Sequence, residues 1–212
     1  KNFGHQLAKE THVEADLIVP VPDSGVPAAI GYSENVKKII ELGIIRNHYV
    51  GRTFIEPTQQ IRSFGVKLKH SVNKTLIKNK SLILIDDSLV RGTTSVKIIK
   101  MLYESGAKEV HLRIASPPIK YPDYYGVDTP SKKELLASNF DIEGMRKFIN
   151  AKTLKFLSIE GLYKSMGFDK RNSSYPQFTD HYFTGDYPIK PIDAINKDID
   201  PYKKISIIRS NF

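Results

Sequence analysis

The residues best suited to chemistry lie in one short stretch, where two adjacent carboxylates, Asp86 and Asp87, directly follow a run of apolar residues. Carboxylates at the end of a strand bind hard cations such as Mg²⁺ or accept hydrogen bonds from the neutral hydroxyl groups of a ligand. A loop of hydroxyl residues with one glycine, Gly92, comes next and leads into a helix. Backbone N–H groups at such a helix start can bind phosphate. The stretch therefore predicts a ligand with a phosphate at one end and a diol or a metal ion at the other.

The elements that must position these residues alternate between strands and helices, which predicts an α/β fold with a mainly parallel sheet flanked by helices. The expected strands cover residues 16–21, 43–45, 81–85, 110–114 and 154–157. The expected helices run from Pro27 to Ile40 and over residues 96–103, 142–149 and 159–166. The continuous apolar run at 82–85 is typical of a central strand buried on both faces.

The C-terminal third contains a capping box, Ser131 to Glu134, which predicts the start of a helix there. From Asp169 the composition shifts to Tyr, Pro, Asp and Ser with little periodicity. We therefore expect one domain over residues 1–168 and an irregular C-terminal arm over residues 169–212.

Composition limits the class of protein. The chain has 32 basic and 23 acidic residues, a net charge of +9, which favours a polyanionic partner. Aromatic residues are not interleaved with the basic residues between Arg62 and Lys80, so we expect no nucleic-acid surface. Cysteine is absent, which excludes thiolate metal sites and a cysteine nucleophile. No apolar run approaches the roughly 20 residues of a membrane span, so we expect a cytoplasmic protein without membrane contact. Five histidines lie at unrelated spacings and are assigned no role: His5, His12, His70, His111 and His181.

The stretch from Leu82 to Ser95 resembles the phosphoribosylpyrophosphate (PRPP) motif of the phosphoribosyltransferases. The chain as a whole is most similar to the glutamine PRPP amidotransferases. Their pattern is matched in order at residues 20–25, 47–55, 116–119 and 125–128, and the resemblance covers roughly residues 4 to 168. It implies a type I phosphoribosyltransferase-like fold and an enzyme that forms 5-phosphoribosylamine and pyrophosphate from PRPP and ammonia, the first step of purine synthesis.

The resemblance also implies roles for individual residues. Asp86 and Asp87 would hold the ribose hydroxyls and a bound Mg²⁺, with Ser24 as a further metal ligand. The polar segment 46–69 matches the family's flexible loop, which closes over PRPP. The pocket for the 5′-phosphate would consist of Ser88, Arg91, Gly92, Thr93, Thr94 and Ser95. Catalytic residues within the flexible loop would be Tyr49, Arg52 and Lys69, with Arg52 and Lys69 neutralising the departing pyrophosphate.

The chain departs from the family in three ways. Its resemblance begins inside the second half of the family's pattern, so we expect no N-terminal glutaminase, and ammonia would come from free solution or from a separate glutaminase chain. One branch of the family carries an iron–sulfur cluster, but the expected cysteine positions hold Asp123, Thr179 and Tyr182, so no cluster is expected. Residues 46–48 are Arg-Asn-His where the family commonly has Lys-Asn-Arg, which bears on inhibition by purine nucleotides.

Two other functions stay open from the sequence. One is a PRPP-binding regulator that catalyses nothing, and the other is a catalytically inactive subunit of a split amidotransferase. The resemblance further implies a homo-oligomer.

Overall fold

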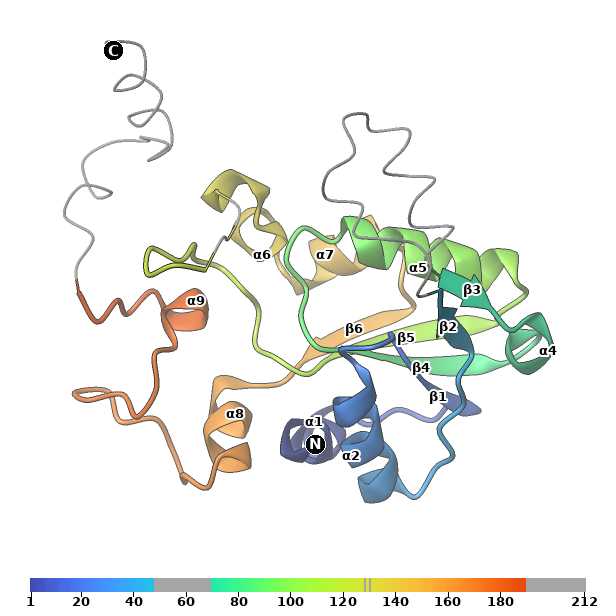
Figure 1. Ribbon diagram of the computed structural model, residues 1–212, viewed down its shortest axis with the longest axis horizontal. Coiled ribbons are helices and arrows are strands. Elements are labelled where there is room, and N and C mark those ends of the chain that lie inside the picture. Colours follow the sequence, from blue (N-terminus) through green and yellow to red (C-terminus); the bar gives the residue numbers. More distant parts are fainter. Residues whose placement is uncertain (48–69, 128, 130, 190–212) are drawn as a thin grey trace, which may run out of the picture.

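A computed structural model describes residues 1–47, 70–127, 129 and 131–189. Its main sheet has four parallel strands in the order β1-β4-β5-β6 (Figure 1). Their bounds are Leu17–Pro20 for β1, Ser81–Asp86 for β4, Glu109–Ile114 for β5 and Thr153–Phe156 for β6. The predicted mainly parallel sheet is confirmed, and β4 lies inside it, paired with both β1 and β5.

Helices cover both faces of this sheet (Figure 1). On one face lie α1 (Asn2–Thr11), α2 (Val26–Val36) and α8 (Ile159–Ser165), and on the other lie α5 (Thr93–Glu104) and α7 (Ile142–Ile149). Successive side chains of a strand point to opposite faces. In β4, accordingly, Leu82 and Leu84 belong to the core beneath α5 and α7, whereas Ile83 and Ile85 belong to the core beneath α1 and α2. This double burial anchors the strand that ends in Asp86.

The helix α2 ends earlier than the sequence predicted. It stops at Val36 rather than Ile40, because Lys37 adopts the left-handed conformation with φ 53° and ψ 41°. Ile40 instead forms an isolated parallel bridge with Ile18 of β1. The apolar residues beyond Val36 therefore extend along the sheet edge rather than along a helix face.

A second, two-stranded antiparallel sheet pairs β2 (Ile44–Arg46) with β3 (His70–Val72). The short helix α4 (Lys74–Ile77) follows and leads into β4. The predicted strand at 43–45 thus belongs to this small sheet. Its register places Arg46 opposite His70, so the described residues on either side of segment 48–69 lie close together.

After β5, the predicted capping box forms between Ser131 and Glu134, around the 3₁₀ helix η2 (Lys132–Glu134). The helix α6 (Leu136–Asn139) follows directly. After α8, residues 167–180 form no helix or strand, and the chain then enters the short α9 (His181–Thr184). In Figure 1 this stretch runs along the side of the molecule beyond α8.

Candidate functional site

The strand β4 delivers two different carboxylates to its carboxyl end. The side chain of Asp86 is buried, with the residue 7% exposed, whereas Asp87 is exposed. Asp86 Oδ1 accepts a hydrogen bond of 2.9 Å from the backbone N–H of Asp87. Burial, with the negative charge of Asp87, raises the pKa of Asp86 well above its ordinary value. The site therefore holds two adjacent carboxylates that lack a compensating cation among the described residues.

The loop after Asp87 is shaped to present backbone N–H groups. Leu89 is buried and anchors the loop, and Gly92 caps α5 with a φ of 75°, a conformation that favours glycine. Among the described residues no side chain caps α5, and its first turn contains no acidic residue. The first turn leaves N–H groups without intrahelical partners, and the helix dipole makes that end positive. An anion would be stabilised there, beside the exposed hydroxyl residues Thr93 and Thr94.

Two further predicted residues of this pocket, Ser88 and Ser95, lie at either end of the loop. Ser88 is half-buried, and Ser95 is buried in the first turn of α5. All the residues predicted for the phosphate pocket, which are close in the sequence, thus lie in the loop after β4 and the first turn of α5.

Ser24 lies on the turn after β1, at the same edge of the sheet as Asp86. The backbone N–H of Val21 donates to the carbonyl of Ile85 at 2.8 Å, which ties the turn after β1 to the end of β4. Gly25 is required here, because a Cβ at this position would lie 2.4 Å from the same carbonyl oxygen. This close approach places the exposed Ser24 on a turn directly beside the strand end that carries Asp86.

The small sheet contacts this turn through an ion pair between Arg46 of β2 and Asp23. Arg46 is therefore neutralised by the residue that precedes Ser24. The three residues that the sequence predicted as catalytic, Tyr49, Arg52 and Lys69, lie outside the described residues.

The donor set fits a hard divalent cation. Mg²⁺ typically takes one or two protein carboxylates and completes its octahedron with water and substrate phosphates. Asp86, Asp87 and the hydroxyl of Ser24 offer such a set, and no described residue is a cationic partner of the buried Asp86. Within the described ranges there is no cluster of three His, Cys, Asp or Glu side chains that would form an all-protein cage. The residues therefore fit a metal that is shared with a phosphorylated ligand.

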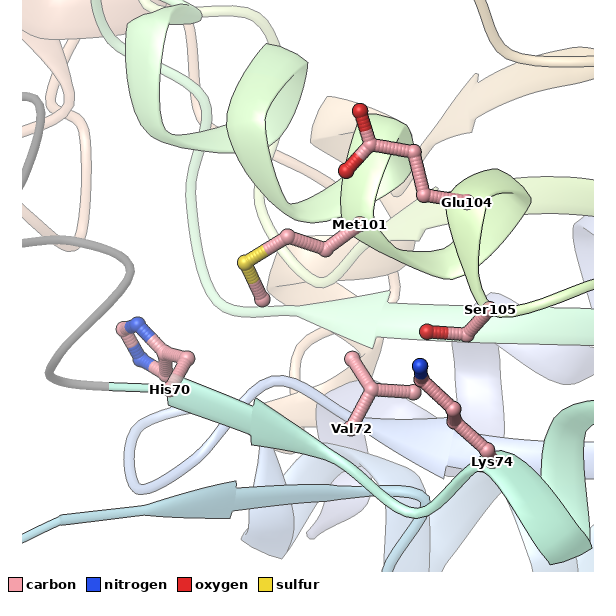
Figure 2. Close-up of a pocket in the computed structure, with 6 residues that line it drawn as sticks. All are labelled: His70, Val72, Lys74, Met101, Glu104 and Ser105. Atoms are coloured by element: carbon pink, nitrogen blue, oxygen red, sulfur yellow. The ribbon is translucent and has the colours of Figure 1, made fainter.

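A surface hollow elsewhere on the molecule is not part of this site (Figure 2). It lies between β3 and the last turns of α5 and is lined by His70, Val72, Lys74, Met101, Glu104 and Ser105. Met101 is eight residues from the start of α5 at Thr93, or about 12 Å along the helix axis. The hollow therefore lies away from the end of α5 that faces Asp86.

Comparison with known proteins identifies the family. No family model matches the chain. It is, however, 58% identical to the amidophosphoribosyltransferase of Rhizobium etli over all 212 residues, which make up 42% of that relative. It is 50% identical to the Bacillus subtilis amidophosphoribosyltransferase over 188 residues, 89% of this chain and 39% of the relative. The chain belongs to the amidophosphoribosyltransferase family.

A solved structure agrees with these relatives. The B. subtilis glutamine PRPP amidotransferase, in complex with ADP and GMP, matches with a TM-score of 0.78 and 49% sequence identity, over 88% of this chain and 41% of that one. The chain thus spans about two fifths of the length of these relatives, and the part it matches is the phosphoribosyltransferase domain. Each helix in the described ranges is too short or too polar to cross a lipid bilayer.

The arm brings Tyr182 next to Asp123, and both are positions that the resemblance assigned to cluster cysteines. Asp123 Oδ1 lies 2.7 Å from Nε2 of His181, and both side chains are 1% exposed. The neighbouring Tyr182 accepts hydrogen bonds at its carbonyl from the N–H groups of Lys120 and Tyr121, while Thr179 is exposed. A buried carboxylate–imidazole contact thus joins the arm to the loop after β5. The sequence assigned His181 no role, because its partner lies 58 residues away.

Sequence reasoning also missed a partner of the loop between β4 and α5. This loop, residues 87–92, is called the phosphate loop below because the sequence predicts a phosphate pocket there. Arg91 Nε donates to Oε1 of Glu134 at 3.1 Å, across 43 residues of sequence. The capping box was the available signal, because it fixed Glu134 at a turn, but it gave no indication of what else that carboxylate contacts.

Proposed function

We propose that this chain binds PRPP with Mg²⁺ at the carboxyl edge of its parallel sheet and transfers the phosphoribosyl group to ammonia. The products are 5-phosphoribosylamine and pyrophosphate. The observation that carries the proposal is the unit from Asp86 to Ser95, where two adjacent carboxylates precede a helix start that no described side chain caps. Membership of the amidophosphoribosyltransferase family supports it.

Different residues of this unit would bind different parts of PRPP. Asp86 and Asp87 would accept hydrogen bonds from the ribose hydroxyls and, with Ser24, hold Mg²⁺. The 5′-phosphate would lie at the start of α5, bound by backbone N–H groups and by the side chains of Ser88, Arg91, Thr93, Thr94 and Ser95 around Gly92. A carboxylate pair would repel a phosphate, so the 5′-phosphate would bind at the start of α5 and not beside Asp86 and Asp87.

The reaction would proceed by substitution at C1 of the ribose. The bond from C1 to the pyrophosphate oxygen breaks, and the nitrogen lone pair of ammonia forms the new bond to C1, after which the ammonium nitrogen loses a proton. The transition state resembles an oxocarbenium ion, so the chain acts by holding the ribose and stabilising charge rather than through a protein nucleophile. Bound Mg²⁺ would supply positive charge at the pyrophosphate. Arg52 and Lys69, with Tyr49 in the same segment, are the further residues that we propose for this end of the ligand.

The partners follow from the same proposal. Purine nucleotides are candidate inhibitors, since the B. subtilis relative was solved in complex with ADP and GMP. Ammonia would come from solution or from a glutaminase, because this chain contains no cysteine to attack glutamine. We also propose that the protein acts in the cytoplasm as a homo-oligomer; the relatives from Arabidopsis thaliana are chloroplastic.

The test is release of pyrophosphate from PRPP and Mg²⁺ by the purified chain, with ammonium chloride or with glutamine. We expect turnover with ammonium and none with glutamine. Turnover with glutamine would contradict the proposed source of ammonia. If PRPP binds but no pyrophosphate is released with ammonium, the chain is a PRPP-binding regulator or an inactive subunit. If PRPP does not bind, the proposed site is wrong.

A further inference from the structure

The guanidinium of Arg91 is held from one side by the carboxylate of Glu134. The contact joins Nε of Arg91 to Oε1 at 3.1 Å, and the side chains are 45% and 51% exposed. Arg91 is the residue immediately before Gly92, which caps α5. An exposed ion pair of this kind usually contributes little to stability. Its position beside the proposed phosphate pocket therefore calls for a different explanation.

Glu134 is itself fixed in place. Its second oxygen, Oε2, accepts hydrogen bonds from the backbone N–H of Ser131 at 3.2 Å and from the Ser131 hydroxyl at 3.1 Å. Burial would raise the pKa of Glu134, but the Ser131 hydrogen bonds and the Arg91 charge hold it below its ordinary value. The carboxylate is thus ionised at neutral pH, with one oxygen committed to its own turn and the other to Arg91.

The turn that carries Glu134 is attached to the phosphate loop on both sides of Arg91. The backbone N–H of Leu136 donates to the carbonyl of Val90 at 2.9 Å. On the other side, a Cβ added to Gly92 would lie 2.8 Å from Cδ2 of Leu136, so the two segments are in close contact. The two contacts of Leu136, with Val90 and with Gly92, therefore hold the turn against the loop on either side of Arg91. They limit how far the Arg91–Glu134 ion pair can change its geometry.

A guanidinium offers five N–H donors in a rigid plane, and a partner on Nε fixes the orientation of that plane. Within the described residues, Nε is the atom of Arg91 that forms a hydrogen bond, which leaves the Nη1 and Nη2 groups for a ligand. We propose that Glu134 is a positioning residue: it orients Arg91 so that its Nη groups bind the 5′-phosphate of PRPP. This inference rests on the proposed function. It adds a residue outside the strand–loop–helix unit to the recognition of the phosphate.

The proposal predicts an order among substitutions at Glu134. Glu134→Ala removes the acceptor, so Arg91 loses its orientation and PRPP binding weakens by about 3- to 10-fold. Glu134→Gln keeps one carbonyl oxygen, which can accept from Arg91 Nε or from Ser131 but not from both, because the amide NH2 group then faces the other donor. Glu134→Gln therefore binds PRPP with an affinity between those of the wild type and Glu134→Ala.

A double-substitution cycle separates positioning from a merely structural role. Arg91→Ala is expected to weaken PRPP binding by about 10-fold or more, because a charge-assisted contact to phosphate is lost. If Glu134 acts through Arg91, the double variant Arg91→Ala/Glu134→Ala binds no more weakly than Arg91→Ala alone. The matched control is Glu104→Ala, which removes an exposed carboxylate paired with Lys100 in the last turn of α5.

The experiment is calorimetric titration of PRPP with Mg²⁺ into the full 212-residue chain and these variants, with thermal denaturation of each. In ammonium-dependent turnover, Glu134→Ala should raise KM for PRPP at nearly unchanged kcat. The proposal is overturned if Glu134→Ala binds PRPP like Glu104→Ala, or if the two losses in the double variant add. If Glu134→Ala fails to fold, PRPP binding by Glu134→Gln weaker than that of Arg91→Ala overturns it instead. Failure of the wild type to bind PRPP would refute the proposed function itself, a different result from any of these.

Discussion

Asp86 at the candidate site and Asp180 in the C-terminal arm are both buried carboxylates, 7% and 2% exposed, yet their surroundings are opposite. Asp180 accepts hydrogen bonds from Nε of Arg171 at 2.5 Å, from the hydroxyl of Tyr163 at 2.8 Å and from Thr184 at 3.1 Å. Asp86 accepts one from the N–H of its neighbour Asp87, and that neighbour is itself negatively charged. Among the residues that the structure describes, Asp180 is surrounded by hydrogen-bond donors and Asp86 is not.

The pKa values of the two groups differ for this reason. Burial would raise the pKa of Asp180, but its hydrogen bonds to Arg171, Tyr163 and Thr184 hold it below the ordinary value of 3.8. Burial and Asp180 together raise the pKa of Tyr163 to about 12, so its hydroxyl remains a donor at neutral pH. The pKa of Asp86 is instead well above its ordinary value. The comparison indicates that Asp180 serves the fold, whereas Asp86 is available to a cationic or hydroxyl-bearing ligand.

The largest expected effect is on turnover at the site. Asp86→Asn and Asp87→Asn each remove a charge from the proposed metal and diol site, and ammonium-dependent turnover should fall by about 100-fold or more. The melting temperature should stay within about 2 °C of the wild type, because neither carboxylate forms an ion pair with a described residue. The measurements are pyrophosphate release and thermal denaturation. Near-normal turnover by either variant would show that these carboxylates do not hold the substrate.

Next in size is the effect of Asp180→Asn on the arm. This substitution leaves Arg171 without its buried carboxylate, and breaking a buried ion pair costs about 3 kcal/mol. Amide hydrogen exchange in α9 should therefore accelerate by about 100-fold, while PRPP binding changes little. The control is Asp186→Asn, which removes a half-exposed partner of the same Arg171 and should have a much smaller effect. Equal exchange in both variants would contradict the role given to burial.

A smaller effect is expected from Gly92→Ala in the phosphate loop. The φ of 75° costs an L-residue about 1 to 2 kcal/mol, and the added methyl group would meet Leu136. The melting temperature should fall by about 3 to 6 °C and PRPP affinity by about 10-fold. Gly126→Ala is the control, since Gly126 also has a positive φ of 114° but no atom of the described residues lies within 4 Å of the added group. It should lose stability without loss of PRPP affinity.

The smallest effect concerns pH. A carboxylate whose folded pKa lies below its unfolded value contributes its full stability above the unfolded pKa and loses it as the pH falls through the folded pKa. The contribution of Asp180 should therefore be constant from pH 7 to pH 5 and decline only below about pH 4. Exchange in α9, corrected for its intrinsic pH dependence, measures this. Loss of protection already between pH 7 and pH 5 would show that another group controls the arm.

The sequence predicted the parts of the molecule that depend on local pattern. The apolar run before Asp86 identified β4 as a central strand, and the hydroxyl residues with Gly92 predicted a loop that leads into a helix. The helix was expected from Val96, whereas α5 begins at Thr93. The capping box placed Glu134 at a turn. In each case, the residues that determine the structure are neighbours in the chain, so their spacing alone carries the information.

Contacts between distant residues could not be predicted in the same way. Arg91 and Glu134 are 43 residues apart, and Asp123 and His181 are 58 apart, with nothing in either local sequence to name the partner. The end of α2 was predicted wrongly, because the apolar residues after Val36 continue a helical pattern. The backbone of Lys37 and the pairing of Ile40 with the sheet override that pattern. Tertiary contacts decided these features, and they are visible only in the fold.

The central claim is that Asp86 and Asp87 are left open for a substrate that brings its own cation. Its most direct test is equilibrium binding of PRPP to the wild type and to Asp87→Asn, each with Mg²⁺ and with EDTA. The account predicts that the wild type binds PRPP in Mg²⁺ and loses about 10-fold or more of that affinity in EDTA, whereas Asp87→Asn binds weakly in both. Equal affinity of the two proteins in Mg²⁺, or no effect of EDTA on the wild type, would contradict it.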